Sequence, residues 1–242
     1  MKYLYVNGCS MSDGSCLLEY DKERIKKLDY VTDSNWDIGF DERWSKLLAN
    51  KLNLKEINQA QHGGSNDRII RMTMDWCSDN KSKLKDTLFV IGWTAFNRFE
   101  FWDNFLNRFV QVSNGEPTHN DREDKRLQLY VNQYWKERHN DLETYDKLLR
   151  KIISLQSFFK SNNLSYLFLD AIGSQMDIIY NHKYNSFIDK KYWWNYSKKI
   201  NSFPDLAWTL NSYGIDSDGT DGHPGIEAHK ELSEQLYEML DE

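Results

Sequence analysis

The stretch KYLYVNGCSMSDG, residues 2–14, decides the fold that we expect for this chain. Lys2–Val6 is a short run of β-forming residues, and Gly8 then ends the strand so that Ser10 emerges in a turn at its carboxyl end. Open α/β sheets bind their ligands at that end of their strands. A serine placed there is a nucleophile only where the fold also supplies a base and an oxyanion hole.

Further β-rich and helical segments alternate along the chain. Three more strands are expected, at Lys55–Asn58, Asp86–Gly92 (DTLFVIG) and Leu164–Asp170 (LSYLFLD). The last two are continuous apolar runs, which are typical of strands covered on both faces of a sheet. Four helices are expected: one capped by Asp41 and running to about Asn53, one after the glycine turn at 58–68, one over Asp141–Asn162 and one over about Ile226–Leu240. Because each return between parallel strands needs a crossover helix, the pattern predicts an α/β fold, a three-layer α/β/α sandwich with a mostly parallel central sheet.

Two aromatic-rich stretches interrupt this alternation, at about residues 99–140 and 173–213. In the first, aromatic residues alternate with charged ones without a clear period, and we expect an insertion that is partly helical. The 242 residues include only three prolines and 12 glycines, which leaves little material for a flexible linker. We therefore expect a single domain, 1–242, that carries both insertions.

The composition argues against several classes of protein. A net charge of -6, from 31 basic and 37 acidic residues, disfavours nonspecific binding to nucleic acid, which needs a concentrated positive face. No run approaches the roughly 18 apolar residues of a membrane span, and the first residues lack the apolar core of a signal peptide. Three cysteines, an odd number, in a chain that needs no disulfides are expected to be reduced thiols. We expect a cytoplasmic protein with no membrane or nucleic-acid partner.

A histidine near the C-terminus supplies the base that Ser10 requires. His223 lies in the turn GDGHPG, directly before the last expected helix, where a loop residue can lean over the carboxyl ends of the strands. Asp221 and Asp218 are both close enough in sequence to orient its imidazole. Backbone N–H groups of the glycine turn at His62–Asn66, with that of Ser10, can face a developing oxyanion. Five other histidines are expected to be surface or structural residues: His62, His119, His139, His182 and His229.

Four short blocks of the chain resemble the SGNH, or GDSL-type, hydrolase superfamily. Gly8-Cys9-Ser10 is similar to the Gly-Asp-Ser block of that family, with Cys9 in place of the aspartate. Asn58 followed by Gly63 is similar to the second block, which implies Gly63 as the oxyanion-hole glycine. The resemblance implies the flavodoxin-like arrangement of this superfamily, with Ser10 as the nucleophile and as a backbone donor to the oxyanion.

The other two blocks depart from the family's pattern. The third supplies an asparagine soon after a strand, and here Thr94 holds that position while Asn97 lies one turn further on. A threonine hydroxyl offers one donor where an amide offers two, and either residue is open as the last oxyanion donor. The fourth block, Asp-x-x-His, lacks an aspartate three residues before His223. The family's acid is therefore carried onto Asp221, with Asp218 as the substitute.

The resemblance implies a serine esterase that cleaves a carboxylic ester through an acyl-enzyme on Ser10, without a cofactor or metal. Its expected substrate is a small-molecule or carbohydrate ester, such as an acetyl ester of a sugar. The alternative is a catalytically weak or inactive scaffold that binds a glycan or another partner through its aromatic insertions. A calcium loop over Asp216–Glu227 fails in register, because Asp221 falls where an EF-hand requires glycine. A nucleotide site is disfavoured because the turn at Gly63-Gly64 lacks a phosphate-loop motif.

Overall fold

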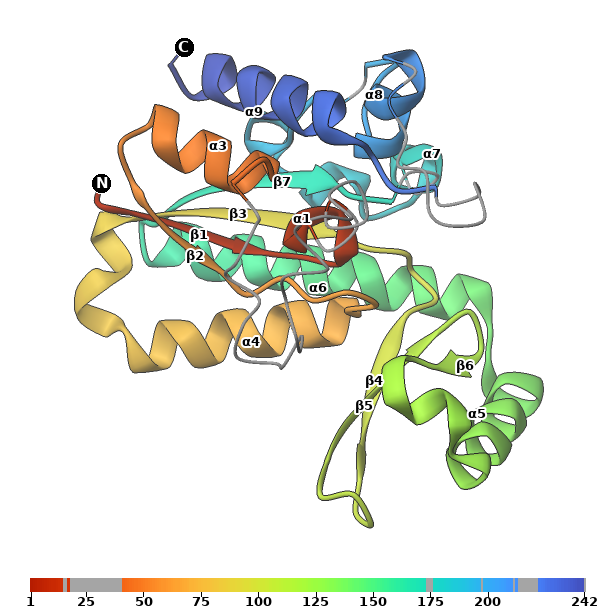
Figure 1. Cartoon of the computed structure of the whole chain (residues 1–242). Coiled ribbons are helices and arrows are strands. Elements are labelled where there is room, and N and C mark those ends of the chain that lie inside the picture. The colour runs from red at the N-terminus through yellow and green to blue at the C-terminus, as the bar shows by residue number, and fades with distance from the viewer. Residues whose placement is uncertain are drawn as a thin grey trace, which may run out of the picture.

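The computed structural model describes residues 1–14, 17, 41–172, 176–196, 198–210, 212 and 222–241. Its central sheet has four parallel strands in the order β2-β1-β3-β7 (Figure 1). The strands are β1 (Tyr3–Asn7), β2 (Lys55–Asn58), β3 (Thr87–Trp93) and β7 (Ser165–Asp170). Each begins and ends within about one residue of its expected bounds, and the α/β class with a parallel sheet is confirmed.

Helices cover both faces of this sheet and give it three layers (Figure 1). One face carries α3 (Trp44–Lys51), α8 (Phe203–Thr209) and α9 (Ile226–Asp241), and the other carries α4 (Asn66–Asp79) and α6 (Asp141–Ser161). A short 3-10 helix, η2 (Lys81–Asp86), leads from α4 into β3. Successive strand residues alternate between two cores: Leu4 packs with residues of α3 and α9, whereas Tyr5 packs with residues of α4 and α6. Every residue of β3 is buried, as expected for a strand covered on both faces.

Two helices begin differently from the sequence-based expectation. Ser10 lies at the start of a short helix, α1 (Ser10–Asp13), and not in an open turn. The cap expected at Asp41 is wrong, since α3 begins at Trp44. The Trp44 N–H donates instead to Nδ1 of His229 at 3.1 Å, so a side chain from α9 satisfies the first amide of α3. A distant contact thus replaces the local cap.

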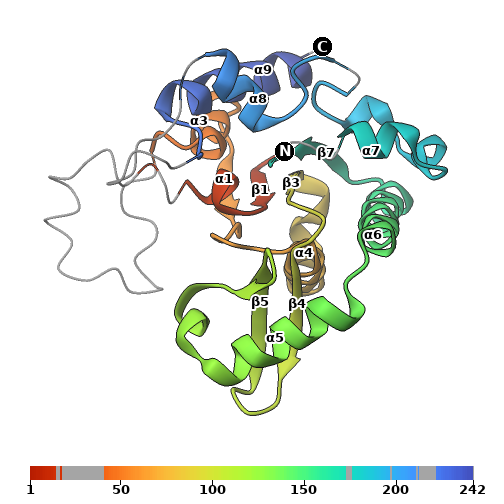
Figure 2. The ribbon, with the colours of Figure 1, turned by 90° about the vertical axis from the view of Figure 1, so that its right-hand side faces the viewer.

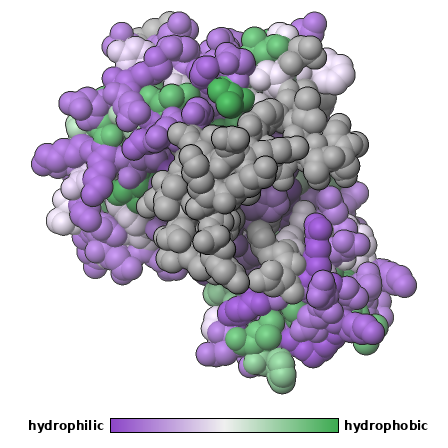
Figure 3. Space-filling view, in the orientation of Figure 1, coloured by the Kyte–Doolittle hydropathy of each residue, from purple (hydrophilic) through white to green (hydrophobic). Residues whose placement is uncertain are grey.

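Residues 99–138, which we call the lobe, project beside the sheet, as Figure 2 shows. The lobe contains a three-stranded antiparallel sheet and two helices: β4 (Phe99–Asp103), β5 (Arg108–Ser113), β6 (Glu116–Pro117), the 3-10 helix η3 (His119–Glu123) and α5 (Lys125–Arg138). Aromatic rings join the hairpin to α5: Phe99 contacts Tyr134 and Phe101 contacts Tyr130, with ring centroids 4.9 and 4.8 Å apart. At its outer end, hydrophobic side chains lie among hydrophilic ones (Figure 3).

The lobe is also where the structure departs most from the sequence pattern. That pattern predicts a partly helical insertion, and the structure adds three strands to the helix α5. The sequence signal for the hairpin between β5 and β6 is Asn114-Gly115. Both residues have positive φ, 52° and 79°, and Ser113 pairs with Glu116 across the turn. An Asn-Gly pair between two β-rich runs is typical of a two-residue hairpin turn. Because both faces of the hairpin carry aromatic residues, its strands do not show the alternation of apolar and polar residues that would identify them.

The second aromatic stretch lies along the outer edge of β7. It contains α7 (Met176–Asn181), η4 (Asn185–Phe187), η5 (Lys190–Tyr192) and α8. The Trp194 N–H donates to the Phe168 carbonyl of β7 at 2.8 Å, and Asp170 forms an isolated bridge with Ser202. These contacts cover part of an edge that another strand could otherwise join. In the described part of the chain, no helix is long and apolar enough to cross a membrane.

Candidate active site

The turns that follow β1, β2 and β3 meet at the carboxyl edge of the sheet. β1 lies between β2 and β3, and its last residue, Asn7, is in register with Ile91 of β3. The Gln61 N–H donates to the Gly8 carbonyl at 3.2 Å, which ties the second turn to the first. Since parallel strands all end at one edge, the sheet gathers residues from three distant parts of the chain there.

Ser10 and His223 are in direct contact at this edge. Ser10 begins α1 and is 3% exposed, whereas His223 lies in the turn before α9 and is partly exposed. The Oγ of Ser10 lies 2.8 Å from Nε2 of His223. A serine hydroxyl that donates to Nε2 leaves the ring proton on Nδ1, where a carboxylate can accept it. The structure therefore brings together the two residues that the sequence analysis assigns as nucleophile and base.

A second histidine lies beside His223. His62 is exposed, and its ring stacks on that of His223 with centroids 5.8 Å apart. The sequence carries no signal for this contact, because it depends on how the turn after β2 packs against the turn before α9. The two candidate acids, Asp218 and Asp221, lie outside the described residues.

The glycine turn after β2 packs its backbone against the turn after β1. Gly63 has a φ of 68°, a conformation that favours glycine, and the Gly64 N–H closes the turn on the Gln61 carbonyl at 2.8 Å. A Cβ at Gly64 would lie 3.0 Å from the Gly8 carbonyl oxygen, so a side chain there would push the two turns apart. The Gly63 N–H donates to no other residue in the described ranges. This donor therefore remains available to a ligand.

The turn after β3 is held by the side chain of Asn66, the first residue of α4. The Asn66 amide accepts from the Thr94 N–H at 3.0 Å and donates to the carbonyls of Thr94 and Ala95 at 2.9 and 3.1 Å. Both Asn66 and Thr94 are buried. Because Asn66 follows Gly63 closely in sequence, these three hydrogen bonds hold the turn after β2 and the turn after β3 together. Both amide hydrogens are used, and Asn66 has none left for an oxyanion.

Thr94 and Asn97, the two candidates for the last oxyanion donor, have different surroundings. The Thr94 hydroxyl accepts a hydrogen bond from Nη1 of Arg98 at 3.0 Å, and its own hydrogen has no acceptor in the described part of the chain. Asn97 donates its amide to Oδ1 of Asn114 at 3.0 Å, in the β5–β6 turn of the lobe. Asn97 thus has one of its two amide hydrogens bound to the lobe, while among the described residues the single hydrogen of the Thr94 hydroxyl is not used.

Two asparagines that end strands, the buried Asn7 and the partly buried Asn58, are structural parts of the site. Asn7, the last residue of β1, donates to the Ile69 carbonyl at 3.0 Å and accepts the Gly8 N–H at 2.9 Å. Asn58, the last residue of β2, donates to the Ser12 carbonyl of α1 at 2.8 Å. Neither role was predicted from the sequence, in which Asn58 only marks the second block of the family resemblance. An asparagine at the end of both strands is the signal that could have identified this role.

His229 is a neutral structural histidine behind the site. It is 2% exposed, and its Nδ1 accepts the Trp44 N–H, so the ring proton lies on Nε2. Burial, followed by nearby His223 and Arg43, lowers the pKa of His229 from 6.5 to about 3. At neutral pH His229 therefore carries no charge that would compete with His223.

A family model matches residues 31–194, well over half of the sequence, and describes a family of unknown function, DUF6071. The chain belongs to DUF6071. The matched segment includes Gly63 and Thr94, while Ser10 and His223 lie on either side of it. No curated protein matches the sequence.

Solved structures show which fold this DUF6071 chain shares. Est2A, an acetyl xylan esterase from the rumen bacterium Butyrivibrio proteoclasticus, is 14% identical with a TM-score of 0.53, over 99% of this chain and 63% of that one. A protein described as lipolytic and of the G-D-S-L family, from Desulfitobacterium hafniense DCB-2, is 12% identical with a TM-score of 0.50, over 99% of both chains. TesA is 13% identical with a TM-score of 0.50, over 99% of this chain and 98% of that one. At these identities the likeness shows the fold of GDSL-type hydrolases and leaves the activity open.

Proposed function

We propose that this DUF6071 protein is a serine ester hydrolase. The observation that carries the proposal is the 2.8 Å contact between Oγ of Ser10 and Nε2 of His223 at the carboxyl edge of the sheet. A serine hydroxyl is a weak nucleophile until a base takes its proton, and an imidazole within hydrogen-bond reach is such a base. The likeness to GDSL-type esterases in fold supports the same assignment.

The proposed reaction has two halves. In the first, Nε2 of His223 accepts the Ser10 proton while Oγ attacks the ester carbonyl carbon, and the carbonyl electron pair moves onto oxygen as an oxyanion. The oxyanion collapses, the ester C–O bond breaks, and the alcohol leaves with the proton from His223. In the second, water gives a proton to His223 and attacks the acyl carbon, which releases the carboxylic acid and returns the proton to Ser10.

Three donors would stabilise the oxyanion: the N–H groups of Ser10 and Gly63 and the hydroxyl of Thr94. Ser10 begins α1, so its N–H has no acceptor within that helix. We prefer Thr94 to Asn97 because the Asn97 amide is bonded to Asn114. We assign the acid that orients His223 to Asp221, with Asp218 as its substitute.

As substrate we propose a small acyl ester of a carbohydrate. The support is that Est2A, which shares the fold, is described as an acetyl xylan esterase. The lobe also exposes the rings of Trp102 and Phe105, 48% and 82%, and aromatic faces of this kind can pack against the apolar face of a sugar ring.

Substitution of the contacting pair tests the proposal. Ser10→Ala and His223→Ala should each lower hydrolysis of a chromogenic acetyl ester on the order of 10⁴-fold or more while the thermal midpoint stays unchanged. A fluorophosphonate probe should label the wild type and not Ser10→Ala. If the assigned acid is right, Asp221→Asn should lower the rate more than Asp218→Asn, and the reverse order would move the acid to Asp218.

Matched controls are available on the same elements. Ser12→Ala removes a hydroxyl of α1 that has no partner in the described part of the chain, and His139→Ala removes a histidine at the end of α5. Both should keep the wild-type rate and labelling. Probe labelling of Ser10→Ala would refute the nucleophile. A wild type that neither reacts with the probe nor hydrolyses esters would favour the alternative, a scaffold that only binds its partner.

A further inference from the structure

Arg98 has different surroundings from four other arginines of the chain. Those four each donate to a carboxylate: Arg43, Arg71, Arg108 and Arg126. Arg98 donates to the Thr94 hydroxyl at 3.0 Å instead, and within the described ranges it forms no ion pair with an acid. Its Nε is buried and has no hydrogen-bond partner there either. A partly buried guanidinium is ordinarily paired with an anion, and no acid among the described residues compensates this charge next to the proposed oxyanion donor.

The backbone turn before Arg98 brings its side chain back to the Thr94 hydroxyl. The Arg98 N–H donates to the Ala95 carbonyl at 3.2 Å, which closes a tight turn and returns the side chain to Thr94. Asn66 binds both the N–H and the carbonyl of Thr94, so Thr94 itself is held from the other side. The two contacts together fix the residue that stands where the SGNH family has its oxyanion asparagine.

The chemistry of the two groups determines which of them donates in this hydrogen bond. A hydroxyl has one hydrogen and two lone pairs, whereas a guanidinium has donors only. Nη1 of Arg98 therefore uses a lone pair of the Thr94 oxygen and leaves its hydrogen for another acceptor. A hydroxyl that already accepts a bond from a cation is also polarised into a stronger donor.

We propose that Arg98 is a positioning residue for the oxyanion of ester hydrolysis, acting through Thr94. The inference rests on the proposed function. Arg98 holds the Thr94 hydroxyl so that its hydrogen points to the oxyanion. The positive charge of Arg98, which no acid in the described ranges pairs with, favours the negative charge that develops there. Thr94 and Arg98 together supply what a single asparagine amide supplies at this position of the SGNH family.

A double-mutant cycle on a neutral acetyl ester tests the inference. Arg98→Met should lower kcat about 10- to 100-fold and change KM less than about threefold, since the interaction strengthens only in the transition state. Thr94→Val removes the hydroxyl at nearly constant volume and should lower kcat on the order of 100-fold. Adding Arg98→Met to Thr94→Val should cost no more than about threefold further, because the group through which Arg98 acts is already gone. Arg98→Lys, which keeps the charge, should recover part of the lost kcat.

Controls separate this role from a purely structural one. Arg138→Met, at the exposed end of α5, should keep the wild-type kcat. Thermal midpoints and fluorophosphonate labelling of every variant show whether the fold and Ser10 are intact.

Three results would overturn the inference. The first is a wild-type kcat in Arg98→Met, and the second is an equal loss on adding Arg98→Met to either background. The third is a loss confined to the KM of anionic esters, which would make Arg98 a binding site for a substrate carboxylate. An inactive and unlabelled wild type would instead refute the proposed function itself, and the inference with it.

Discussion

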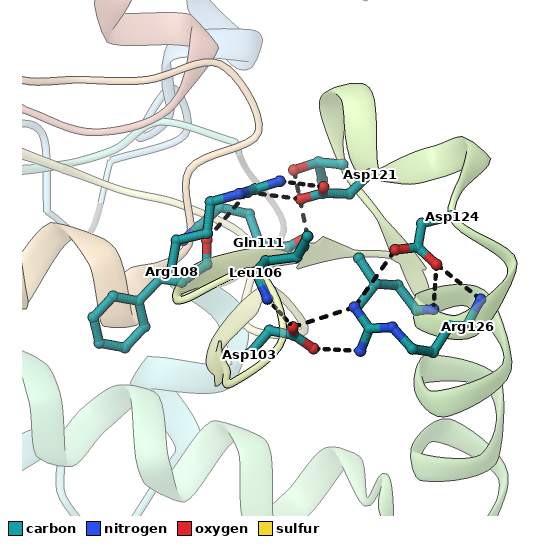
Figure 4. A network of polar contacts seen from close by, with 10 residues as sticks. Asp103, Leu106, Arg108, Gln111, Asp121, Asp124 and Arg126 are labelled. Atoms are coloured by element: carbon teal, nitrogen blue, oxygen red, sulfur yellow. Dashed lines mark hydrogen bonds and ion pairs between the residues drawn. The ribbon is translucent and has the colours of Figure 1, made fainter.

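The carboxyl edge of the sheet and the lobe are held together by different kinds of contact. At the edge, buried asparagine amides bind backbone groups, as Asn66 binds Thr94. In the lobe, arginines at its surface pair with aspartates: Arg108 with Asp121, and Arg126 with Asp103 at 2.6 Å (Figure 4). The same Asp103 accepts the Leu106 N–H at the β4–β5 turn.

The difference shows what precise placement of side chains at this edge requires of its supports. An amide bound to backbone is directional and uncharged, so it sets the geometry of a turn without changing the electrostatic field around Ser10 and His223. An ion pair with one exposed partner is screened by water and salt, and its long side chains can move without breaking the fold. We therefore expect substitutions at the edge to affect both stability and activity, and substitutions of the lobe's ion pairs to have small, local effects.

The largest effect is expected for Asn66→Ala. This change leaves the buried N–H and carbonyl of Thr94 without the Asn66 amide and removes one of two bonds to the Ala95 carbonyl, so it should lower the free energy of unfolding by about 2–4 kcal/mol. It should also lower kcat, because the Thr94 turn loosens. Asn80→Ala, at the other end of α4, removes two partly exposed bonds, one to the Trp76 carbonyl and one from the Lys83 ammonium, and should cost at most about 1 kcal/mol. Urea unfolding and ester hydrolysis measure the stability and kcat of both variants. Equal losses in Asn66→Ala and Asn80→Ala would contradict a special role for the amide at the edge of the sheet.

An intermediate effect is expected from the buried histidine that supports α3. His229 has a pKa of about 3 when folded and about 6.5 when unfolded, so the unfolded chain binds one more proton between these values. Its stabilising contribution is therefore complete above pH 6.5 and decreases as the pH falls towards 3, by at most about 1.4 kcal/mol per pH unit. In His229→Asn, the amide oxygen can accept the Trp44 N–H without this titration. The wild type should lose stability more steeply than the variant from pH 6 to 4 in urea unfolding, and parallel curves would contradict the prediction.

The smallest effect is expected in the lobe. Arg126→Met breaks the pair with Asp103, but the Arg126 side chain is 46% exposed, so the thermal midpoint should shift by no more than about 2 °C. The shift should shrink in 1 M NaCl, where surface charges are screened, and kcat should not change. Lys136→Met, on the same helix, is the control for loss of an exposed charge. A marked drop in kcat of Arg126→Met would show that this ion pair supports the reaction and not only the fold of the lobe.

The pattern of apolar residues in short segments was enough to locate the strands of the central sheet, because buried strands are made of apolar residues. DTLFVIG is apolar throughout, and the strand it predicts, β3, is buried throughout. The hairpins of the lobe escaped prediction because their aromatic residues pack on both sides, against α5 and against arginines such as Arg71 over the Phe109 ring. The start of α3 escaped for a different reason, since its first N–H is satisfied from α9 rather than by a neighbour in sequence.

The sequence by itself determined the α/β fold, the position of Ser10 after the first strand, the glycine turn at Gly63 and the turn that carries His223. These follow from alternation, apolar runs and glycine placement, which are properties of short segments. Only the tertiary structure decided that Ser10 meets His223, that the Asn97 amide binds the lobe, and that Arg98 donates to the Thr94 hydroxyl with no acid among the described residues paired to it. Such contacts depend on how distant segments pack at the edge of a parallel sheet, and no local pattern records that packing.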